Sequence, residues 1–308
     1  MCHSDIHKVD NDWGPGKFPM VPGHEVIGKI VEVGPAVTKF KVGDRVGFGP
    51  QRDSCKSCEY CEAHNEQLCS GMQGLYDPEF GGYATSIQVP ERFTFLVPEG
   101  IPDEMAPLLC AGVTTHAPLA RHVAEGNKVG IVGIGGLGHV AVQYSAKMKC
   151  DTVAISRSNA KEAEAREFGA ASFLSTNDKE AVKAARGTFD VILCTAAAHF
   201  DPNLYMALLK PRGKFVLVGL PPASEQLSFS PFSLVGGEKQ LIGSMIGGTD
   251  NMDEMLAFSA EHKVFPKIEM LEFDDAQTGF DKMRDNSVRY RSVLKVKGFR
   301  EKMLAQQQ

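Results

Sequence analysis

Apolar segments recur at regular intervals through the middle of the chain. Residues 128–132 form a short apolar run, and apolar side chains then recur at helical spacing between Leu137 and Met148. Further apolar runs, each bounded by turn-forming residues, occupy residues 151–156, 189–197, 213–221 and 240–248. Residues 201–213 are expected to form a helix that ends at Pro211 and Gly213. This alternation predicts an α/β fold with a parallel, doubly wound sheet between about residues 115 and 250.

The pattern differs on either side of this region. Up to about Thr114 the chain carries short alternating stretches separated by glycines and turn pairs, for example at 33–47 and 80–90, which is typical of a β-barrel. Residues 267–296 predict a strand, a helix and a second strand. With 308 residues the chain exceeds what one core usually holds, so two domains are expected.

Composition narrows the functional classes. The chain is 43% hydrophobic and 23% charged, and its net charge of −5 includes no long run of one sign. This argues against nucleic acid or an anionic membrane as the main partner. No apolar stretch is long enough to span a bilayer, and the polar N-terminus lacks the core of a signal peptide. We therefore expect a cytoplasmic, reducing location, where disulfides are rare.

Four of the eight cysteines lie close together, at Cys55, Cys58, Cys61 and Cys69. Sulfurs two residues apart converge readily, and four thiolates in a tetrahedron favour zinc over an iron–sulfur cluster, whose usual spacings differ. Because all four positions are filled by protein, such a centre is structural. Free surface thiols are the alternative, but clustered exposed thiols oxidise readily.

A second set of metal-binding residue types is scattered along the chain. Cys2, His24 and Cys110 would provide the two thiolates and one imidazole of a catalytic zinc with one position open. Spacing alone does not assemble them. Taken singly, Cys110 is more often a buried small hydrophobic residue, and His24 is as often a turn residue as a ligand.

Four motifs occur in order: "GHEVIGKIVEVG", the four-cysteine segment, "LCAGVTT" and "GIGGLGH". Together they resemble the zinc-dependent medium-chain alcohol dehydrogenases, and "CHSDIH", "APLLCAG", "GSMIGG" and "VRYRSVL" narrow the resemblance to the cinnamyl-alcohol-dehydrogenase-like branch, which reduces aldehydes with NADPH. The resemblance implies a GroES-like β-barrel catalytic domain at 1–114 and 251–308 and a Rossmann NADP-binding domain at 115–250. It also implies two Zn²⁺ per chain, one of them held by Cys2, His24 and Cys110.

The resemblance further implies roles around that metal. Glu25 would lie beside it and bind it transiently, while Asp5 would orient His24; a turn or helix cap is the alternative for Asp5. Ser4 would contact the substrate oxygen and His7 would pass its proton to solvent, which suits a side chain whose unperturbed pKa is near neutral. Trp13 would line the substrate cleft between the domains, or simply pack in a core.

The glycine-rich segment after residues 128–132 predicts a dinucleotide site. Gly133, Gly135 and Gly138 permit a tight turn, close approach of a pyrophosphate, and close packing of helix on strand. The amide groups at the start of the following helix attract anions, and Gly136 and Leu137 lie within the same loop. A lone G-x-G-x-x-G motif is a weak signal for dinucleotide binding, but here a predicted strand precedes it and a predicted helix follows it, which strengthens the signal.

The strand at 151–156 ends where an NAD enzyme is expected to carry an acidic residue. This chain has Ser156 and Arg157 there, with Lys161 shortly after. Serine and two cations would attract a 2′-phosphate, so NADP(H) is predicted over NAD(H). The alternative is ordinary solvated charges at a helix start.

The family pattern adds three cofactor contacts and a partner. His3 would face the pyrophosphate, Thr114 would contact the nicotinamide end, and Arg291 would reach the phosphates. The apolar strand at 240–248 would pair with its counterpart in a second subunit, so a homodimer is expected. The predicted activity is hydride transfer between NADP(H) and an aldehyde or primary alcohol.

Family members carry further early strands before the motif that here begins at Cys2. We therefore expect a fraying residue behind this ligand, bare apolar faces, and weaker metal retention. The alternatives are an inactive NADPH-binding member stabilised by zinc, a metal-free quinone-reductase-like protein, and a zinc-ribbon nucleic-acid module. The metal-binding residue types argue against the quinone-reductase-like protein, and the negative net charge of the chain argues against the nucleic-acid module.

Overall fold

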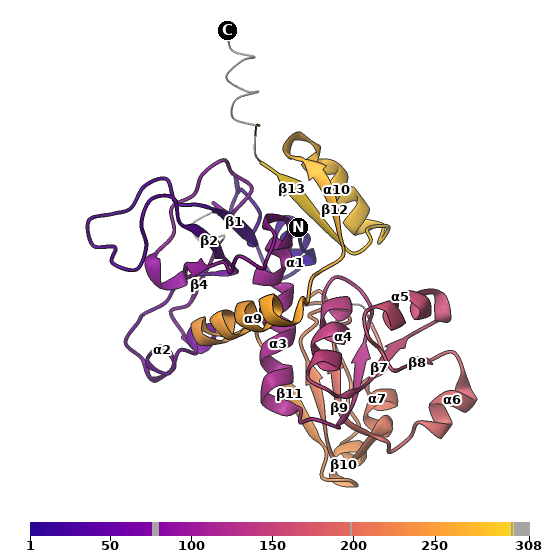
Figure 1. The fold of residues 1–308 in the computed structure, drawn as a ribbon. Coiled ribbons are helices and arrows are strands. Elements are labelled where there is room, and N and C mark those ends of the chain that lie inside the picture. Colours follow the sequence, from indigo (N-terminus) through magenta and orange to yellow (C-terminus); the bar gives the residue numbers. More distant parts are fainter. Residues whose placement is uncertain (76–79, 198, 297, 299–308) are drawn as a thin grey trace. The chain divides into compact units, whose positions relative to one another are not determined.

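In this computed structural model, residues 1–75, 80–197, 199–296 and 298 are described. The chain divides into two compact units, Met1–Cys110 with Gly247–Gln308, and Ala111–Ile246 (Figure 1). The boundaries expected from the sequence were Thr114 and Asn251. Within the described residues, no helix combines the length and apolar character that crossing a membrane requires.

The second unit contains a six-stranded parallel sheet in the order β11-β10-β9-β6-β7-β8. Its strands are β6 (Lys128–Val132), β7 (Asp151–Ser156), β8 (Ser172–Ser175), β9 (Phe189–Cys194), β10 (Leu209–Leu217) and β11 (Gln240–Gly243). Its helices are α3 (Ala111–His122), α4 (Gly138–Lys147), η4 (Asn159–Lys161), α5 (Glu162–Glu167), α6 (Lys179–Ala184), α7 (Pro202–Leu208) and α8 (Pro231–Val235). The predicted doubly wound sheet is confirmed, and its strand order reverses between β6 and β9, which is where such sheets bind ligands.

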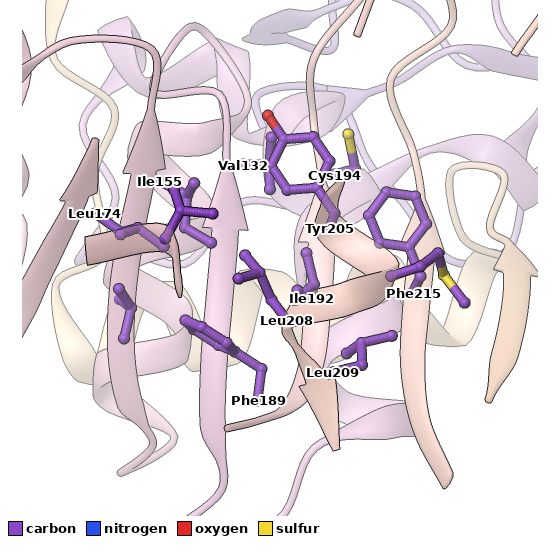
Figure 2. Packing of buried hydrophobic residues seen from close by; sticks show 13 residues of the cluster. Val132, Ile155, Leu174, Phe189, Ile192, Cys194, Tyr205, Leu208, Leu209 and Phe215 are labelled. Carbon is purple, nitrogen blue, oxygen red and sulfur yellow. The ribbon is translucent and has the colours of Figure 1, made fainter. Parts of the chain in front are cut away.

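The core of this sheet explains why the apolar runs were visible in the sequence. Figure 2 shows Ile155 of β7, Phe189 and Ile192 of β9, and Phe215 of β10 in one apolar cluster, and each is almost fully buried. Parallel strands covered on both faces read as continuous apolar runs, because neither face meets water.

One helix boundary was predicted wrongly. Helix α7 ends at Leu208, not at Pro211 and Gly213, because Leu209 is already extended and begins β10 beside β9. Pairing with the buried neighbouring strand overrides the local tendency of residues 209–210 to continue the helix. The proline and glycine instead lie within β10.

The first unit is built from short strands, as expected. Sheets β1-β2-β5, β3-β4 and β12-β13 contain β1 (Val26–Lys29), β2 (Arg45–Phe48), β3 (Gln51–Asp53), β4 (Gln73–Gly74), β5 (Phe95–Leu96), β12 (Ile268–Glu272) and β13 (Arg291–Lys295). The helical segments are α1 (His3–Val9), α2 (Glu59–Glu62), η1 (Glu66–Leu68), η2 (Glu91–Phe93), η3 (Asp103–Leu109), α9 (Thr249–His262), η5 (Phe273–Asp275) and α10 (Ala276–Arg284). The predicted strand, helix and strand of the tail are confirmed as β12, α10 and β13.

Met1, the residue before Cys2, is buried in the structure. Met1 is 6% exposed and packs with Ile6 and Met283, and its nitrogen donates to the carbonyl of Ser292 at 2.9 Å. These contacts fix the position of the following cysteine. Apolar side chains are exposed elsewhere in the unit, including Val31 at 78%.

Candidate functional site

The ligand atoms of Cys2, His24, Glu25 and Cys110 all lie within 4.8 Å of one another. Cys2 caps the start of α1, His24 follows a turn at Gly23, and Cys110 ends η3. All but Glu25 are buried, and two sulfurs with one imidazole are a donor set that suits zinc. The structure thus brings together the three residues that the sequence could not assemble by spacing.

The carboxylate of Asp5 accepts hydrogen bonds that position two of these residues, Cys2 and His24. Its Oδ1 accepts from the main chain of Gly23 and from Nδ1 of His24, both at 3.0 Å. Its Oδ2 accepts from the main chain of Cys2 at 2.9 Å and from the hydroxyl of Tyr83 at 3.0 Å. The carboxylate therefore both caps α1 and occupies Nδ1 of His24, so Nε2 is the ring nitrogen that would bind a metal.

Tyr83 was not identified from the sequence. Burial and the charge of Asp5 raise the pKa of Tyr83 well above its usual value, so the hydroxyl remains a donor. Gly23 has a φ of +97°, and a Cβ there would lie 2.3 Å from the ring of Tyr83. The turn before His24 therefore needs glycine.

The charges of the site are arranged around the same groups. Burial favours a neutral ring, but the charge of Asp5 and its hydrogen bond raise the pKa of His24 to about 10. A hydrogen bond from Cys110, opposed by burial and helped by the charge of Arg291, holds the pKa of Cys2 well below its usual value. Ligands that must lose protons to bind a metal thus lie in a field that already favours one thiolate.

Glu25 is held away from solvent by a buried cation. Its Oε1 accepts from Nη2 of Arg291, which is 4% exposed, and its Oε2 lies 3.2 Å from the nitrogen of Met1. Arg291, expected to reach the cofactor phosphates, therefore has Glu25 as a partner within its own unit. Its role toward phosphate stays a prediction.

Ser4 and His7 follow Cys2 on α1. Ser4 Oγ lies 3.7 Å from the sulfur of Cys2. His7 Nδ1 is 2.6 Å from Oδ2 of Asp12, and the Trp13 ring lies 4.6 Å from the His7 ring. Within the described residues, His7 Nε2 is buried without a hydrogen-bond partner. Asp12 was not identified from the sequence, because its pairing depends on how the chain turns after α1.

The four-cysteine group also fits one metal ion. Its sulfurs lie within 4.8 Å of one another, with Cys58 and Cys61 3.6 Å apart and Cys55 and Cys61 3.9 Å apart. Four thiolates at about 2.3 Å from one centre are about 3.8 Å apart, and a disulfide would need about 2 Å. An iron–sulfur cluster would hold its cysteines further apart. A main-chain hydrogen bond from Ser57 lowers the pKa of Cys55 to about 6.

A buried carboxylate anchors this cysteine lobe to α9. Glu66, fully buried, accepts from the main chain and the hydroxyl of Thr249 at 3.0 Å each, and from Nη2 of Arg92 at 2.8 Å. Arg92 also donates to the carbonyl of Cys61. These contacts hold the segment between Cys61 and Cys69 at its start and at Glu66.

We expect Glu66→Gln to lower the free energy of unfolding by about 2 kcal/mol at neutral pH, because the hydrogen bonds from the partly exposed Arg92 lose their charged acceptor. Urea unfolding measures this, with the exposed Glu62→Gln as the matched control. Burial alone would raise the pKa of Glu66, but Thr249 and Arg92 outweigh it and lower the pKa.

A carboxylate whose folded pKa is lowered stabilises the fold above its unfolded pKa, about 4.3, and loses this as pH falls through the folded value. The difference between wild type and Glu66→Gln should therefore narrow below about pH 4. A constant difference down to that pH, or an equal loss in Glu62→Gln, would contradict this account.

The glycine-rich loop joins β6 to α4. Gly133 has a φ of +86°, and a Cβ at Gly138 would lie 1.8 Å from the carbonyl oxygen of Gly133, so both positions need glycine. At Gly135, a Cβ would meet nothing within 4 Å. Open space over the loop at this point leaves room for a pyrophosphate, which fits the dinucleotide expected from the sequence.

The residues expected around the 2′-phosphate lie at the end of β7. Ser156 is the last residue of the strand, and the Arg157 side chain is exposed. Lys161 Nζ instead donates to the carbonyl of Ile134, in the glycine-rich loop, at 2.7 Å. Thr114 is buried in α3, and His3 is exposed on α1. Their contacts with a cofactor stay predictions.

This chain is similar to known proteins in both of its units. The alcohol dehydrogenase GroES-like domain matches residues 1–99, and the zinc-binding dehydrogenase domain matches residues 136–261. The NADP-dependent alcohol dehydrogenase C 1 of Mycolicibacterium smegmatis is 43% identical over 306 residues, covering 96% of this chain and 87% of the relative.

Two solved structures are similar over nearly the whole chain. A cinnamyl alcohol dehydrogenase from Sorghum bicolor superposes with a TM-score of 0.90 and 37% identity, covering 97% of this chain and 88% of the other. A cinnamyl alcohol dehydrogenase from Helicobacter pylori, complexed with NADP(H), has a TM-score of 0.90 and 36% identity, covering 96% and 88%.

Proposed function

The chain belongs to the zinc-binding alcohol dehydrogenase family, and we propose that it transfers hydride between NADP(H) and an aldehyde or primary alcohol. One observation carries the proposal: the ligand atoms of Cys2, His24 and Cys110 converge although the residues are far apart in sequence. A buried set of three protein ligands is what a catalytic metal requires.

Two ions and one dinucleotide complete the proposed enzyme. Cys2, His24 and Cys110 hold a catalytic Zn²⁺, and the four cysteines of the lobe hold a structural Zn²⁺. When bound, the catalytic ion polarises the substrate oxygen, and NADPH supplies the hydride. Glu25, whose carboxylate lies within 4.8 Å of the three ligand atoms, would be able to bind the ion transiently.

The chain's own residues move the proton. Ser4 lies next to Cys2. In alcohol oxidation its hydroxyl accepts the proton of the substrate hydroxyl and gives its own proton to His7, which passes it outward, and in aldehyde reduction the same transfers run in reverse. The bond to Asp12 fixes the proton of His7 on Nδ1, which leaves Nε2 as the acceptor facing the buried side. Trp13 shields this histidine and contributes an apolar wall for the substrate.

Asp12→Asn should lower the rate of alcohol oxidation about tenfold, because His7 loses the carboxylate that orients it. Loss of the proton-transfer group itself would cost more, ~10²–10⁴-fold, so the effect of losing only its orienting partner should be smaller. The pH profile of kcat should change shape in this variant. Asp10→Asn, which removes a neighbouring exposed carboxylate paired with Arg284, is the control. Equal effects in the two variants would contradict a relay through His7.

We propose NADP(H) as the cofactor because the end of β7 carries no acidic side chain. Ser156 and the exposed Arg157 offer a hydroxyl and a charge to the 2′-phosphate, and the ammonium of Lys161 adds positive charge close by. The loop Gly133, Gly135, Gly136, Leu137 and Gly138 would bind the pyrophosphate through main-chain amides.

We also propose a homodimer formed through β11. This strand is at the edge of the sheet, where Leu241 is 40% exposed, and nearby Phe232 and Val235 of α8 are 90% and 78% exposed. An apolar edge needs to be covered, and pairing with its counterpart in a second chain covers it. The molecular mass in solution tests this; a monomer at micromolar concentration would refute it.

The test of the proposed function is a panel of aromatic and aliphatic aldehydes with NADPH. We expect NADPH oxidation with at least one aldehyde, and weaker activity with NADH. NADPH binding without turnover of any aldehyde would instead support an inactive, zinc-stabilised family member. Absence of both binding and turnover would refute the proposal.

A further inference from the structure

Side chains outside the glycine-rich loop hold three consecutive carbonyl groups within it. The bonds run from Thr195 Oγ1 to Gly133 O at 2.7 Å, from Lys161 Nζ to Ile134 O at 2.7 Å, and from His139 Nδ1 to Gly135 O at 2.8 Å. A carbonyl oxygen only accepts, so the proton of His139 lies on Nδ1. The donors come from the end of β9, from η4 and from the first turn of α4.

These bonds determine where the amide groups of the loop point. In a trans peptide, the carbonyl and the N–H of the next residue point in opposite directions. Tying down the carbonyls of Gly133, Ile134 and Gly135 therefore aims the N–H groups of Ile134, Gly135 and Gly136 the other way. Within the described part of the chain, these three N–H groups make no hydrogen bond.

Two of the three donors, Thr195 and His139, are held in place by their own surroundings. Thr195 is 8% exposed, and its hydroxyl also lies 3.0 Å from the carbonyl of Val132. His139 is fully buried, and its ring meets the edge of Phe168 at 5.4 Å. Rigid donors of this kind keep a loop in one conformation, whereas donors on mobile side chains would not.

We propose that Thr195, Lys161 and His139 are positioning residues that fix the glycine-rich loop in its anion-binding conformation before the cofactor arrives. This inference rests on the proposed use of NADP(H). The loop then loses little entropy on binding, and each held carbonyl polarises its peptide so that the N–H becomes a better donor. Lys161 acts through the carbonyl of Ile134 at the pyrophosphate end.

The test compares two ligands that differ in the pyrophosphate. NADPH carries it, while adenosine 2′-monophosphate has the 2′-phosphate alone. In His139→Leu we expect the Kd for NADPH to rise about fivefold to tenfold, as for the loss of one hydrogen bond, with the Kd for adenosine 2′-monophosphate unchanged. His139→Asn keeps a donor near the position of Nδ1 and should restore NADPH binding.

Thr195→Val and Thr195→Ser form a second pair, because valine has the shape of threonine without its hydroxyl. Thr195→Val should raise the Kd for NADPH and leave the Kd for adenosine 2′-monophosphate unchanged. Thr195→Ser should bind both ligands as wild type does. An unchanged Kd for NADPH in both deletion variants would overturn the inference, as would equal weakening of both ligands, which would indicate general distortion. If the unaltered chain binds neither ligand, the proposed cofactor is wrong and the inference falls with it.

Discussion

Cys110→Ala is expected to lower kcat/KM for aldehyde reduction by about a thousandfold or more. The variant removes one of the three proposed protein ligands, leaving Cys2 and His24, and a catalytic metal contributes several kcal/mol to the transition state. At 1.36 kcal/mol per tenfold, that loss corresponds to the stated factor. Steady-state kinetics measure it, and elemental analysis should find that one zinc per chain remains in the cysteine lobe.

Cys150→Ala is the matched control for this prediction. Cys150 is a half-buried free cysteine that belongs to neither ligand group. Its replacement should leave both activity and zinc content unchanged. Full activity in Cys110→Ala would remove this residue from the ligand set, and loss of both zincs would show that the two groups do not bind independently.

Arg157→Asp should move the cofactor preference from NADPH toward NADH. A hydrogen bond to a charged group contributes about 1.5–3 kcal/mol, so losing the guanidinium alone costs about tenfold to a hundredfold in NADPH efficiency. The new carboxylate repels a 2′-phosphate and accepts from a 2′-hydroxyl, which improves NADH. The ratio of kcat/KM for the two cofactors measures the change.

Arg186→Asp makes the same charge reversal at another exposed position of the same unit. It changes the net charge equally but lies on the segment after α6, so the cofactor ratio should stay as in wild type. An unchanged ratio in Arg157→Asp would refute the assignment of the 2′-phosphate. An equal change of the cofactor ratio in both variants would show that the ratio depends on the net charge of the protein and not on Arg157 itself.

The sequence predicted most of the second unit because its strands are buried on both faces. The runs that became β6, β7, β9 and β10 are continuous and apolar. Strand β8, Ser172–Ser175, was not predicted, because it lies at the sheet edge and is only half apolar. The end of α7 was misplaced, since pairing of Leu209 with Phe189 of β9 depends on tertiary contacts.

The candidate site divides in the same way. The four-cysteine group could be predicted directly, because its spacing is local and its chemistry belongs to few other structures. Cys2, His24 and Cys110 could be grouped only through the family resemblance. Among residues that act through a neighbour, Asp5 was predicted only through that resemblance, and Tyr83 was not predicted.

The reason is physical. Tyr83 bonds to Asp5, 78 residues earlier, and Glu66 bonds to Thr249, 183 residues later. No local pattern distinguishes these side chains from others of their type, because their importance arises from packing between distant segments. Lys161 illustrates the converse: its charge suggested phosphate binding, whereas the folded chain also gives it the carbonyl of Ile134.

The central claim is that Cys2, His24 and Cys110 together hold a metal ion. Anomalous diffraction at the zinc absorption edge, on crystals of the unaltered chain, tests it most directly. The account predicts two peaks per chain, one among the sulfurs of Cys2 and Cys110 and the imidazole of His24, and one among the four cysteines of the lobe. A peak in the lobe alone, with nothing between these three side chains, would contradict the account.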